Sequence, residues 1–202
     1  MTVEHGPTPA LLEDEDLYLP SKESNYRTTV ALRLIALTKS GHFPMVVIDG
    51  WLGVPGGRVK KSEAEGNLVS RGAFSTLIRE FAEECGIDMS PYLSKSACLG
   101  IAEVTEVDTE KRRITERLTP IFVCEIPDSA LSTLRAREDI VVVNIFSHLP
   151  GPLYLDARMA ITYLKWKIDE GRGFGAPVPL NITGKCYFQT RPAKAYLFGR
   201  PW

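Results

Sequence analysis

The sequence predicts an α/β domain in which a mixed β-sheet packs between helices. Segments with strand-like composition alternate with two segments of helical periodicity, which suits layers of helix on sheet. Of the 202 residues, 44% are hydrophobic, enough for one sizeable buried core. The 24 Lys and Arg residues nearly balance the 25 Asp and Glu residues, so the overall charge does not indicate a nucleic-acid or membrane partner.

Five segments rich in β-branched and apolar residues predict the strands of the sheet. In chain order they are Thr28–Thr38, Pro44–Asp49, Ala97–Val107, Ile114–Ile126 and Ile140–Phe146. The turn Ser40-Gly41-His42 separates the first two, and the polar stretch Asp108–Arg113 separates the third and fourth, which we expect to pair.

Two segments have the apolar spacing of amphipathic helices. The first begins near Phe74, and Gly86 stands where a left-handed residue would end it. Its predicted buried stripe comprises Phe74, Leu77, Ile78, Phe81, Ala82 and Cys85. The second helix is Leu155–Glu170, with a predicted buried side of Ala157, Ile161, Leu164 and Ile168.

The first helix carries three glutamates, Glu80, Glu83 and Glu84, spaced i, i+3 and i+4, which brings them to one side of the apolar stripe. Taken alone, such a cluster is an ordinary solvated acidic face. Clustered carboxylates also repel one another, and hard cations such as Mg²⁺ or Mn²⁺ compensate that repulsion with oxygen ligands.

The segment before this helix favours the second interpretation. It contains a Pro55-Gly56-Gly57 corner, whose backbone can approach a ligand closely, and then Glu63. Together these residues make the chain resemble the Nudix hydrolase family, whose motif is Gly, five residues, Glu, seven residues, then Arg-Glu-apolar-x-Glu-Glu-x-Gly-apolar. Nine positions match in order: Gly57, Glu63, Arg79, Glu80, Phe81, Glu83, Glu84, Gly86 and Ile87.

One spacing departs from the family motif. Fifteen residues separate Glu63 from Arg79, where the family has seven, and we interpret the eight extra residues as a loop insertion within Ala64–Arg71. Lengthening a loop costs little free energy.

The resemblance implies an αβα sandwich over roughly residues 26–170 and a metal-dependent pyrophosphohydrolase that cleaves a nucleoside diphosphate linked to another moiety, X. The expected cofactor is Mg²⁺ or Mn²⁺, held by Glu83 and Glu84 first and Glu80 next. The carbonyl of Gly57 or Gly56 is a further expected ligand. A Nudix-fold domain that senses nucleotides or binds proteins without turnover is the alternative function.

The resemblance also implies that Arg79 orients a glutamate, with Glu63 as its partner. The general base stays open between Glu80 and a carboxylate outside the motif, because Nudix enzymes recruit it from different places. The preferred outside candidate is Glu138, followed by Glu103 and Glu106. The predicted substrate-binding residues are Gly56, Gly57 and Arg58.

The moiety X stays open as a nucleotide sugar, a dinucleotide or a nucleoside triphosphate type of substrate. Glu103 occupies the position of the proline that marks ADP-ribose enzymes, and Val104 and Thr105 stand where dinucleoside polyphosphate enzymes have tyrosine. Capped RNA is possible as a substrate but is not indicated.

Residues 1–25 form an acidic N-terminal arm, and residues 171–202 form a C-terminal arm rich in basic and aromatic residues. Aromatic and basic residues together can stack a base and hold phosphates. We favour packing of this arm on the core or on a second subunit, and we expect a homodimer, as for many Nudix enzymes. The four cysteines include no C-x-x-C pair, the start lacks a signal-peptide layout, and no apolar run approaches the roughly 18 residues of a membrane span, so we expect a cytoplasmic protein.

Overall fold

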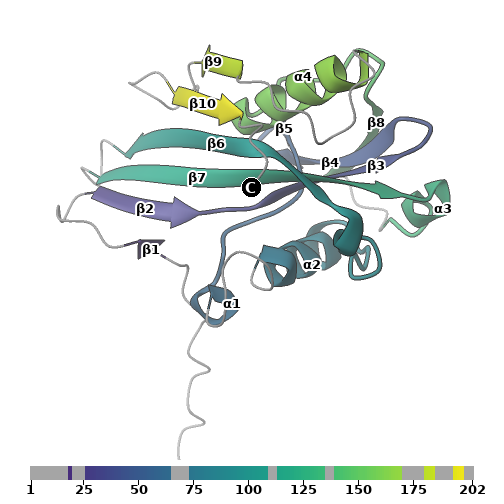
Figure 1. The fold of residues 1–202 in the computed structure, drawn as a ribbon, viewed down its shortest axis with the longest axis horizontal. Helices are drawn as coiled ribbons and strands as arrows, with labels where there is room; N and C mark the ends of the chain where they lie inside the picture. The colour runs from purple at the N-terminus through teal and green to yellow at the C-terminus, as the bar shows by residue number, and fades with distance from the viewer. Residues whose placement is uncertain are drawn as a thin grey trace, which may run out of the picture.

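The protein has three layers, with a β-sheet between helix α2 on one side and helix α4 on the other (Figure 1). The structure is a computed structural model and describes residues 18–19, 26–64, 73–108, 113–134, 139–169, 180–184 and 193–197. The helices are α1 (Lys61–Ala64), α2 (Ala73–Glu84), α3 (Asp128–Leu131) and α4 (Leu155–Asp169), with the 3-10 helix η2 (Leu93–Lys95). The strands are β1 (Tyr18–Leu19), β2 (Tyr26–Val30), β3 (Arg33–Thr38), β4 (His42–Ile48), β5 (Trp51–Gly53), β6 (Ala97–Asp108), β7 (Arg113–Ile126), β8 (Ile140–Asn144), β9 (Leu180–Gly184) and β10 (Ala193–Leu197).

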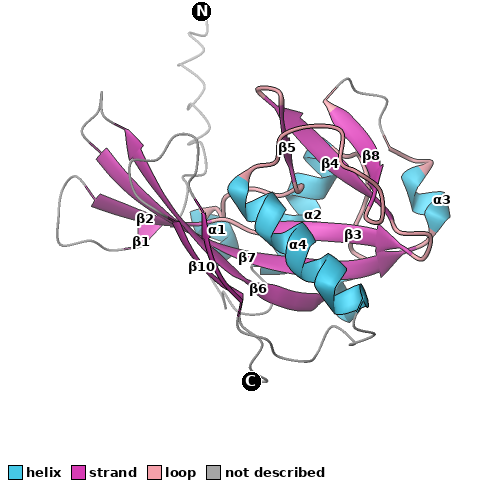
Figure 2. Ribbon diagram, turned by 90° about the horizontal axis from the view of Figure 1, so that it is seen from above, coloured by secondary structure: helices cyan, strands magenta, loops and turns pink. Residues whose placement is uncertain are grey.

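The strands form a large sheet and a small one. The large sheet has the order β1-β2-β7-β6-β10-β9, and β3 also pairs with β7. Strands β2 and β3 run parallel to β7, whereas β6 runs antiparallel to it, so the sheet is mixed as predicted. The small sheet has the order β5-β4-β8 and lies at one end of α4 (Figure 2).

The predicted single strand Thr28–Thr38 is wrong, because the chain leaves the strand geometry at Ala31 and Leu32. Both halves, β2 and β3, pair with β7 in parallel, so the interruption is local. At the break Ala31 forms a bridge with Arg58, and the Leu32 amide donates to the carbonyl of Gly57 (2.8 Å). The strand is interrupted because the glycine corner docks there.

Helix α2 packs on one face of the sheet through the predicted stripe. Leu77, Phe81 and Cys85 are fully buried against Leu34 and Ala36 of β3. Phe74 and Ile78 pack at the margin of the same cluster. Gly86 has φ +74°, as expected for a residue that ends a helix in the left-handed conformation.

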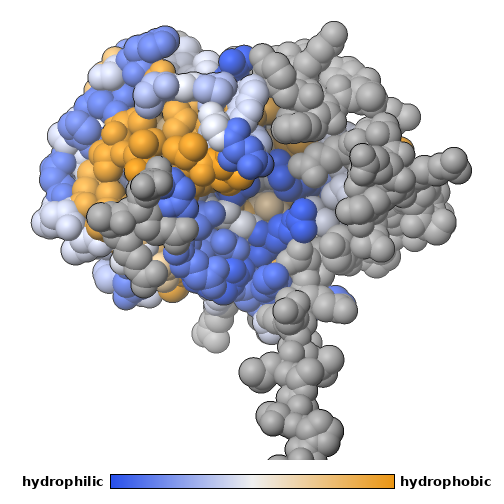
Figure 3. Space-filling view, turned by 180° about the vertical axis from the view of Figure 1, so that it is seen from behind, coloured by the Kyte–Doolittle hydropathy of each residue, from blue (hydrophilic) through white to orange (hydrophobic). Residues whose placement is uncertain are grey.

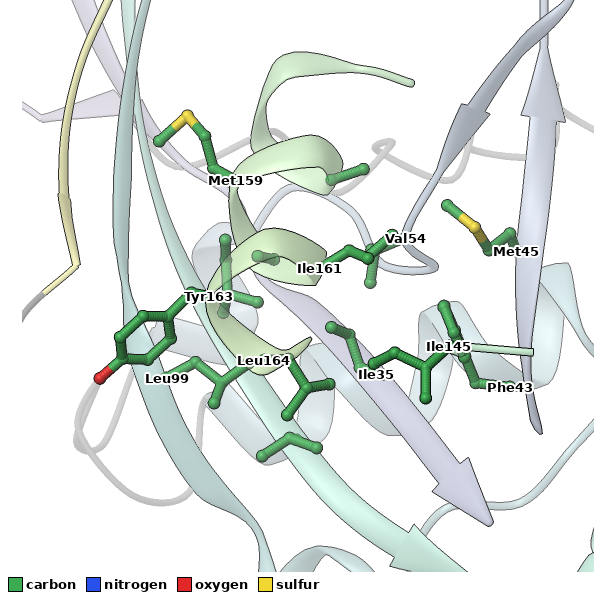
Figure 4. Packing of buried hydrophobic residues seen from close by; sticks show 14 of the residues in the cluster. Ile35, Phe43, Met45, Val54, Leu99, Ile145, Met159, Ile161, Tyr163 and Leu164 are labelled. Carbon is green, nitrogen blue, oxygen red and sulfur yellow. The ribbon is translucent and has the colours of Figure 1, made fainter. Parts of the chain in front are cut away.

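Helix α4 packs on the opposite face. Ile161 and Leu164 of α4 lie near Ile35 of β3 (Figure 4), and the predicted residues Ala157, Ile161 and Leu164 are all buried. Ile168 is partly buried at the margin. Strand β3 therefore supplies alternate side chains to two cores, as the two-residue period of a strand requires.

Between residues 26 and 170, four short elements were not predicted from the sequence: β5, α1, α3 and the 3-10 helix η2. In the two arms, β1, β9 and β10 were not predicted either. The hairpin between β4 and β5 turns at Asp49 (φ +51°) and Gly50 (φ +78°), the pattern of a two-residue type I′ turn. An Asp-Gly pair is a recognised signal for that turn, so β5 could have been found.

In the C-terminal arm, β9 and β10 pair with each other, and β10 pairs with β6 through Ala195↔Ala102 and Tyr196↔Ile101. The division into two arms and a central domain stays a prediction.

No helix in the described ranges is long and apolar enough to cross a membrane. The back of the molecule carries a hydrophobic area next to a hydrophilic one (Figure 3).

Candidate active site at the glycine corner

The Pro55-Gly56-Gly57 corner is fixed to the sheet by backbone hydrogen bonds. Leu32 donates to Gly57 (2.8 Å) and Leu34 donates to Pro55 (3.0 Å), while the amide of Val59 donates to Val30 (3.0 Å). The corner thus runs along the β2–β3 break and is held on both sides of its two glycines.

Both glycines stand where another group approaches closely, with backbone against Gly56 and the movable end of a side chain against Gly57. Gly56 has φ +137°, and a Cβ built on it would lie 2.1 Å from the carbonyl oxygen of Leu32. A Cβ on Gly57 would lie 2.0 Å from Oε1 of Glu80. The carboxylate of Glu80 therefore lies directly against the Gly57 backbone.

Glu63 and Arg79 are in contact despite the inserted segment between them. Arg79 Nε donates to Glu63 Oε1 (2.7 Å) and Nη2 donates to Oε2 (3.3 Å), a two-pronged pairing. Thr76 Oγ1 (2.7 Å) and the Lys60 amide (2.9 Å) also donate to Glu63 Oε2. Lys60 precedes α1 and Glu63 is its third residue, so the bond from the Lys60 amide to the Glu63 side chain is one of the two hydrogen bonds of a capping box.

The surroundings of Glu63 fix its charge. Burial opposes ionisation, but the hydrogen bonds from Arg79, Lys60 and Thr76 outweigh it, so the pKa of Glu63 lies below its ordinary value. The same pairing with Glu63 raises the pKa of the Arg79 guanidinium. With its carboxylate fully engaged, Glu63 is placed to orient Arg79 rather than to bind a ligand.

Arg79 also reaches the acidic cluster of α2. Its Nη1 donates to Glu80 Oε1 (2.7 Å) and contacts Glu83 Oε2 (3.4 Å), and its Nη2 donates to the carbonyl of Arg58 (3.1 Å). Glu80 is mostly buried, with 14% of its side chain exposed, whereas Glu83 is 60% exposed. One guanidinium therefore holds together both glutamate positions and the corner.

Glu84 is the carboxylate with the least compensation. It is largely buried, and its Oε2 accepts the amide of Gly56 (2.8 Å). Its pKa is raised, chiefly by burial and further by the nearby charges of Glu80 and Glu83, against the opposing effects of Gly56 and Arg33. A cation at this point would remove the cost of keeping Glu84 ionised.

The chemistry of the donor set suits a hard cation, since carboxylates of α2 lie against the backbone of the corner, which also carries carbonyl oxygens. The side-chain positions do not yet surround an ion: the described ranges contain no group of three or more His, Cys, Asp and Glu residues that could hold one. Glu80 and Glu83 are turned to Arg79, and Glu84 to Gly56. The metal-ligand set Glu80, Glu83, Glu84 and Gly57 stays a prediction.

Of the remaining predicted residues, one is at the corner and two are on β6. Glu138, the preferred outside base, lies outside the described residues. Glu103 and Glu106 are on β6, which β7 separates from β3. Arg58, a predicted substrate contact, is at the corner with its side chain exposed.

Two residues near the corner were missed: Arg33 of β3 and Asp156 of α4. Arg33 Nη1 donates to the carbonyl of Gly56, and its Nε donates to Asp156 Oδ2 (3.4 Å). Arg117 of β7 approaches the same oxygen (3.8 Å). In the sequence, the feature that could have pointed to Arg33 is the single charged residue in the segment of β3.

Comparison with known proteins gives the same architecture. No family model matches the sequence, and no curated protein matches it. Among solved structures, NrtR of Shewanella oneidensis has a TM-score of 0.51 at 15% identity, covering 85% of this chain and 93% of NrtR. The Nudix domain of the same NrtR, complexed with ADP ribose, has a TM-score of 0.50 at 15% identity, covering 70% of this chain and 88% of that domain.

The chain has the Nudix fold. A MutT Nudix hydrolase from Burkholderia pseudomallei is also similar, at a TM-score of 0.47 and 17% identity, covering 68% of this chain and 98% of that protein. Within the Nudix fold of this chain, the motif residues Gly57, Glu63, Arg79 and Glu80 meet at one place. The expected fold class is confirmed, whereas the roles of the site residues stay predictions.

Proposed function

We propose that the protein is a metal-dependent pyrophosphohydrolase acting on a nucleoside diphosphate linked to a further moiety. The observation that supports this most directly is the convergence at the glycine corner. Arg79 links Glu63 to Glu80, while Glu84 reaches the Gly56 amide from the same helix. An arrangement that only stabilised the fold would not need a buried carboxylate with a raised pKa beside two more carboxylates.

Glu83, Glu84 and Glu80 would hold Mg²⁺ or Mn²⁺, with a carbonyl from Gly57 or Gly56 as a further ligand. When bound, such an ion would neutralise the phosphate oxygens and lower the pKa of a water molecule. Exchange of partners is needed for this, because Glu80 and Glu83 contact Arg79 in the structure. The carbonyl oxygens already accept hydrogen bonds from Leu32 and Arg33, but each has a second lone pair.

The roles of the other residues follow from their contacts. Arg79 holds Glu80 through Oε1, so if Glu80 acts as the general base rather than as a metal ligand, Oε2 is the atom that would accept the proton of the attacking water. Glu63 keeps Arg79 charged and oriented. The corner glycines carry no side chain that would keep a pyrophosphate from the backbone, but Glu80 lies against Gly57 and would have to move for contact there.

The test is a hydrolysis panel of ADP-ribose, NADH, dinucleoside polyphosphates, capped RNA and nucleoside triphosphates, each with Mg²⁺, Mn²⁺ or EDTA. We expect metal-dependent release of a phosphate-containing product from at least one substrate class. Glu84→Gln should abolish it. Glu125→Gln is the matched control, because Glu125 is a 63% exposed glutamate on β7 and should leave the rate unchanged. Release that is equal in EDTA and Mg²⁺ would refute the proposal.

The alternative is a nucleotide sensor without turnover. One observation favours it: the carboxylates are engaged with Arg79 and Gly56 rather than gathered for an ion. The ADP-ribose complex of the NrtR Nudix domain shows that a protein of this fold binds such a ligand. Calorimetric binding of ADP-ribose with no product after long incubation in Mn²⁺ would support the sensor.

We also propose a homodimer. The large hydrophobic side chains that are exposed among the described residues are Ile48 (40%), Val142 (47%) and Phe146 (63%). They lie on or beside the small sheet, where a second subunit would cover them. Light scattering should give twice the mass of the 202-residue chain for the wild type. For Val142→Glu it should give the mass of a single chain. A monomer at micromolar concentration would contradict this.

A further inference from the structure

Arg33 is an unusual residue for its position in β3. Its side chain lies on the α4 side of the sheet, between the buried residues Leu32 and Leu34 in the chain, and is 16% exposed. A guanidinium in such a place needs acceptors for its donors. It has two: the carbonyl of Gly56 at the corner, and Oδ2 of Asp156 at 3.4 Å.

Asp156 is fixed more firmly than Arg33. It is 3% exposed, it lies in the first turn of α4, and its Oδ1 accepts the amide of Ala157 (2.8 Å). Its Oδ2 faces Arg33 and Arg117, at 3.4 and 3.8 Å. A carboxylate at the positive end of a helix, with two guanidinium partners, is a rigid anchor.

Gly56 is therefore held from both sides of the sheet, through its amide in the Pro55–Gly56 peptide and its carbonyl in the Gly56–Gly57 peptide. Its amide donates to Glu84 of α2, and its carbonyl accepts from Arg33, which Asp156 of α4 holds. Gly56 itself has no Cβ and adopts φ +137°, so its own side chain contributes nothing to fixing this conformation.

We propose that Arg33 is a positioning residue: anchored by Asp156, it fixes the Gly56–Gly57 peptide through the Gly56 carbonyl and so keeps the Gly56 amide directed at Glu84. The role requires an arginine. Nε and Nη1 reach two acceptors in different directions, whereas a lysine has one nitrogen and cannot span both. The kinetic part of this proposal rests on the proposed hydrolase function, but its structural part does not.

The test is residue-resolved amide hydrogen exchange by NMR on the full chain, in EDTA, with Arg33→Lys as the main variant. Lysine keeps the charge beside Asp156, so the fold should survive. Exchange of the Gly56 amide should accelerate by about tenfold or more, the factor expected when a hydrogen bond from a charged donor no longer holds the peptide. Amides of the α4 core, such as Leu164, should keep their protection.

Arg117→Met is the matched control. It removes a guanidinium from the same Asp156 oxygen, but the Gly56 carbonyl accepts from Arg33. It should therefore lower the melting temperature while changing Gly56 exchange by less than about threefold, well short of the roughly tenfold effect of a lost charged hydrogen bond. In the hydrolysis assay, Arg33→Lys should lower kcat more than it raises KM. Adding Asp156→Asn to Arg33→Lys should lower kcat little further, because both changes act on the contact between Arg33 and Asp156.

Unchanged Gly56 exchange in Arg33→Lys would overturn the proposal, and so would equal acceleration of every amide in the sheet. A rise in KM alone, with Gly56 exchange unchanged, would also overturn it and make Arg33 a substrate contact. If the wild-type protein hydrolyses no substrate, the proposed function fails, but the exchange measurement still decides the role of Arg33.

Discussion

Asp156 is a buried carboxylate and Glu84 a partly buried one on the opposite face of the same sheet, and their surroundings differ. Asp156 faces Arg33 and Arg117 and accepts the Ala157 amide. Although burial opposes its ionisation, these partners bring its pKa below the ordinary value. Glu84 accepts one backbone amide, and burial together with neighbouring glutamates raises its pKa.

The difference is the one expected between a structural carboxylate and a functional one. The charge of Asp156 is satisfied inside the protein, so the fold depends on it. For Glu84, burial and two neighbouring glutamates outweigh the Gly56 amide and the charge of Arg33, a state that is costly unless something from outside compensates it. Neutralising Asp156 should therefore cost mainly stability, and neutralising Glu84 should cost mainly activity. Similar effects of the two changes would contradict this distinction.

The largest effect on stability should come from Asp156→Asn. The change leaves Arg33 and Arg117 without their shared counter-charge, and breaking a buried ion pair in this way costs about 3–5 kcal/mol. Urea unfolding followed by circular dichroism measures the free energy of unfolding. A loss below about 1 kcal/mol, the range of an ordinary surface change, would show that Asp156 is not the anchor described above.

The largest effect on activity should come from Glu84→Gln. Gln keeps the shape and can still accept the Gly56 amide, but it removes an anionic ligand, so kcat/KM should fall at least about 100-fold, more than is typical when a group that only supports a metal ligand is lost. Glu83→Gln should also reduce turnover strongly. The free energy of unfolding in EDTA should change by less than about 1 kcal/mol, because neutralising Glu84 relieves its repulsion with Glu80 and Glu83. Full activity in both variants would remove the acidic cluster from the site.

The two carboxylates should also respond to pH with opposite signs. Because the pKa of Glu84 is raised by folding, its ionisation destabilises the protein as pH rises from the ordinary glutamate range through the raised value. Glu84→Gln should therefore gain stability relative to wild type as pH rises through that window. The pKa of Asp156 is lowered, so its contribution is present above the ordinary aspartate range and is lost as pH falls through the lowered value. The stability difference between Asp156→Asn and wild type should therefore shrink as pH falls through that lowered value.

Thermal melting in EDTA across pH 3 to 8 measures both differences, with the upper limit set above the ordinary pKa of about 4.3 for glutamate. Parallel curves for Glu84→Gln and wild type would mean that Glu84 is not perturbed by burial.

The contrast also explains what the sequence could reveal. The periodicity of α2 placed Leu77, Phe81 and Cys85 in the core and the glutamates to one side, because helix geometry alone fixes those relations. The residue types of the motif, taken in order, related Glu63 to Arg79 although the spacing between them departs from that of the family, and the two side chains are in contact. Local rules of this kind apply wherever the residues lie in one element or in adjacent ones.

The other half of the site depends on long-range packing. Arg33 and Asp156 are 123 positions apart, and no local pattern relates them. The break between β2 and β3 was missed for the same reason, since it forms where the distant glycine corner hydrogen-bonds to Leu32. The lone arginine in an apolar strand was visible, but its partners depend on how α4 and the corner meet.

The smallest effect is expected from removing the inserted segment. The predicted insertion Ala64–Arg71 includes Ala64, which ends α1 and packs at the margin of the α2 core, while residues 65–72 lie outside the described part of the chain. Deleting 65–72 therefore spares α1 and restores seven residues between Glu63 and Arg79. Halving a loop changes its closure free energy by only about 0.6 kcal/mol, so stability should change little and metal-dependent activity should persist.

Deleting 64–71 is the matched comparison, because it also restores the spacing but removes the last residue of α1. It should cost more, since Glu63 depends on α1 for its contact with the Lys60 amide. Thermal melting and the hydrolysis assay distinguish the two deletions. Equal loss of activity in both deletions would mean that the inserted segment supports the Glu63–Arg79 pair. The site around Glu84 would then depend on residues outside the motif.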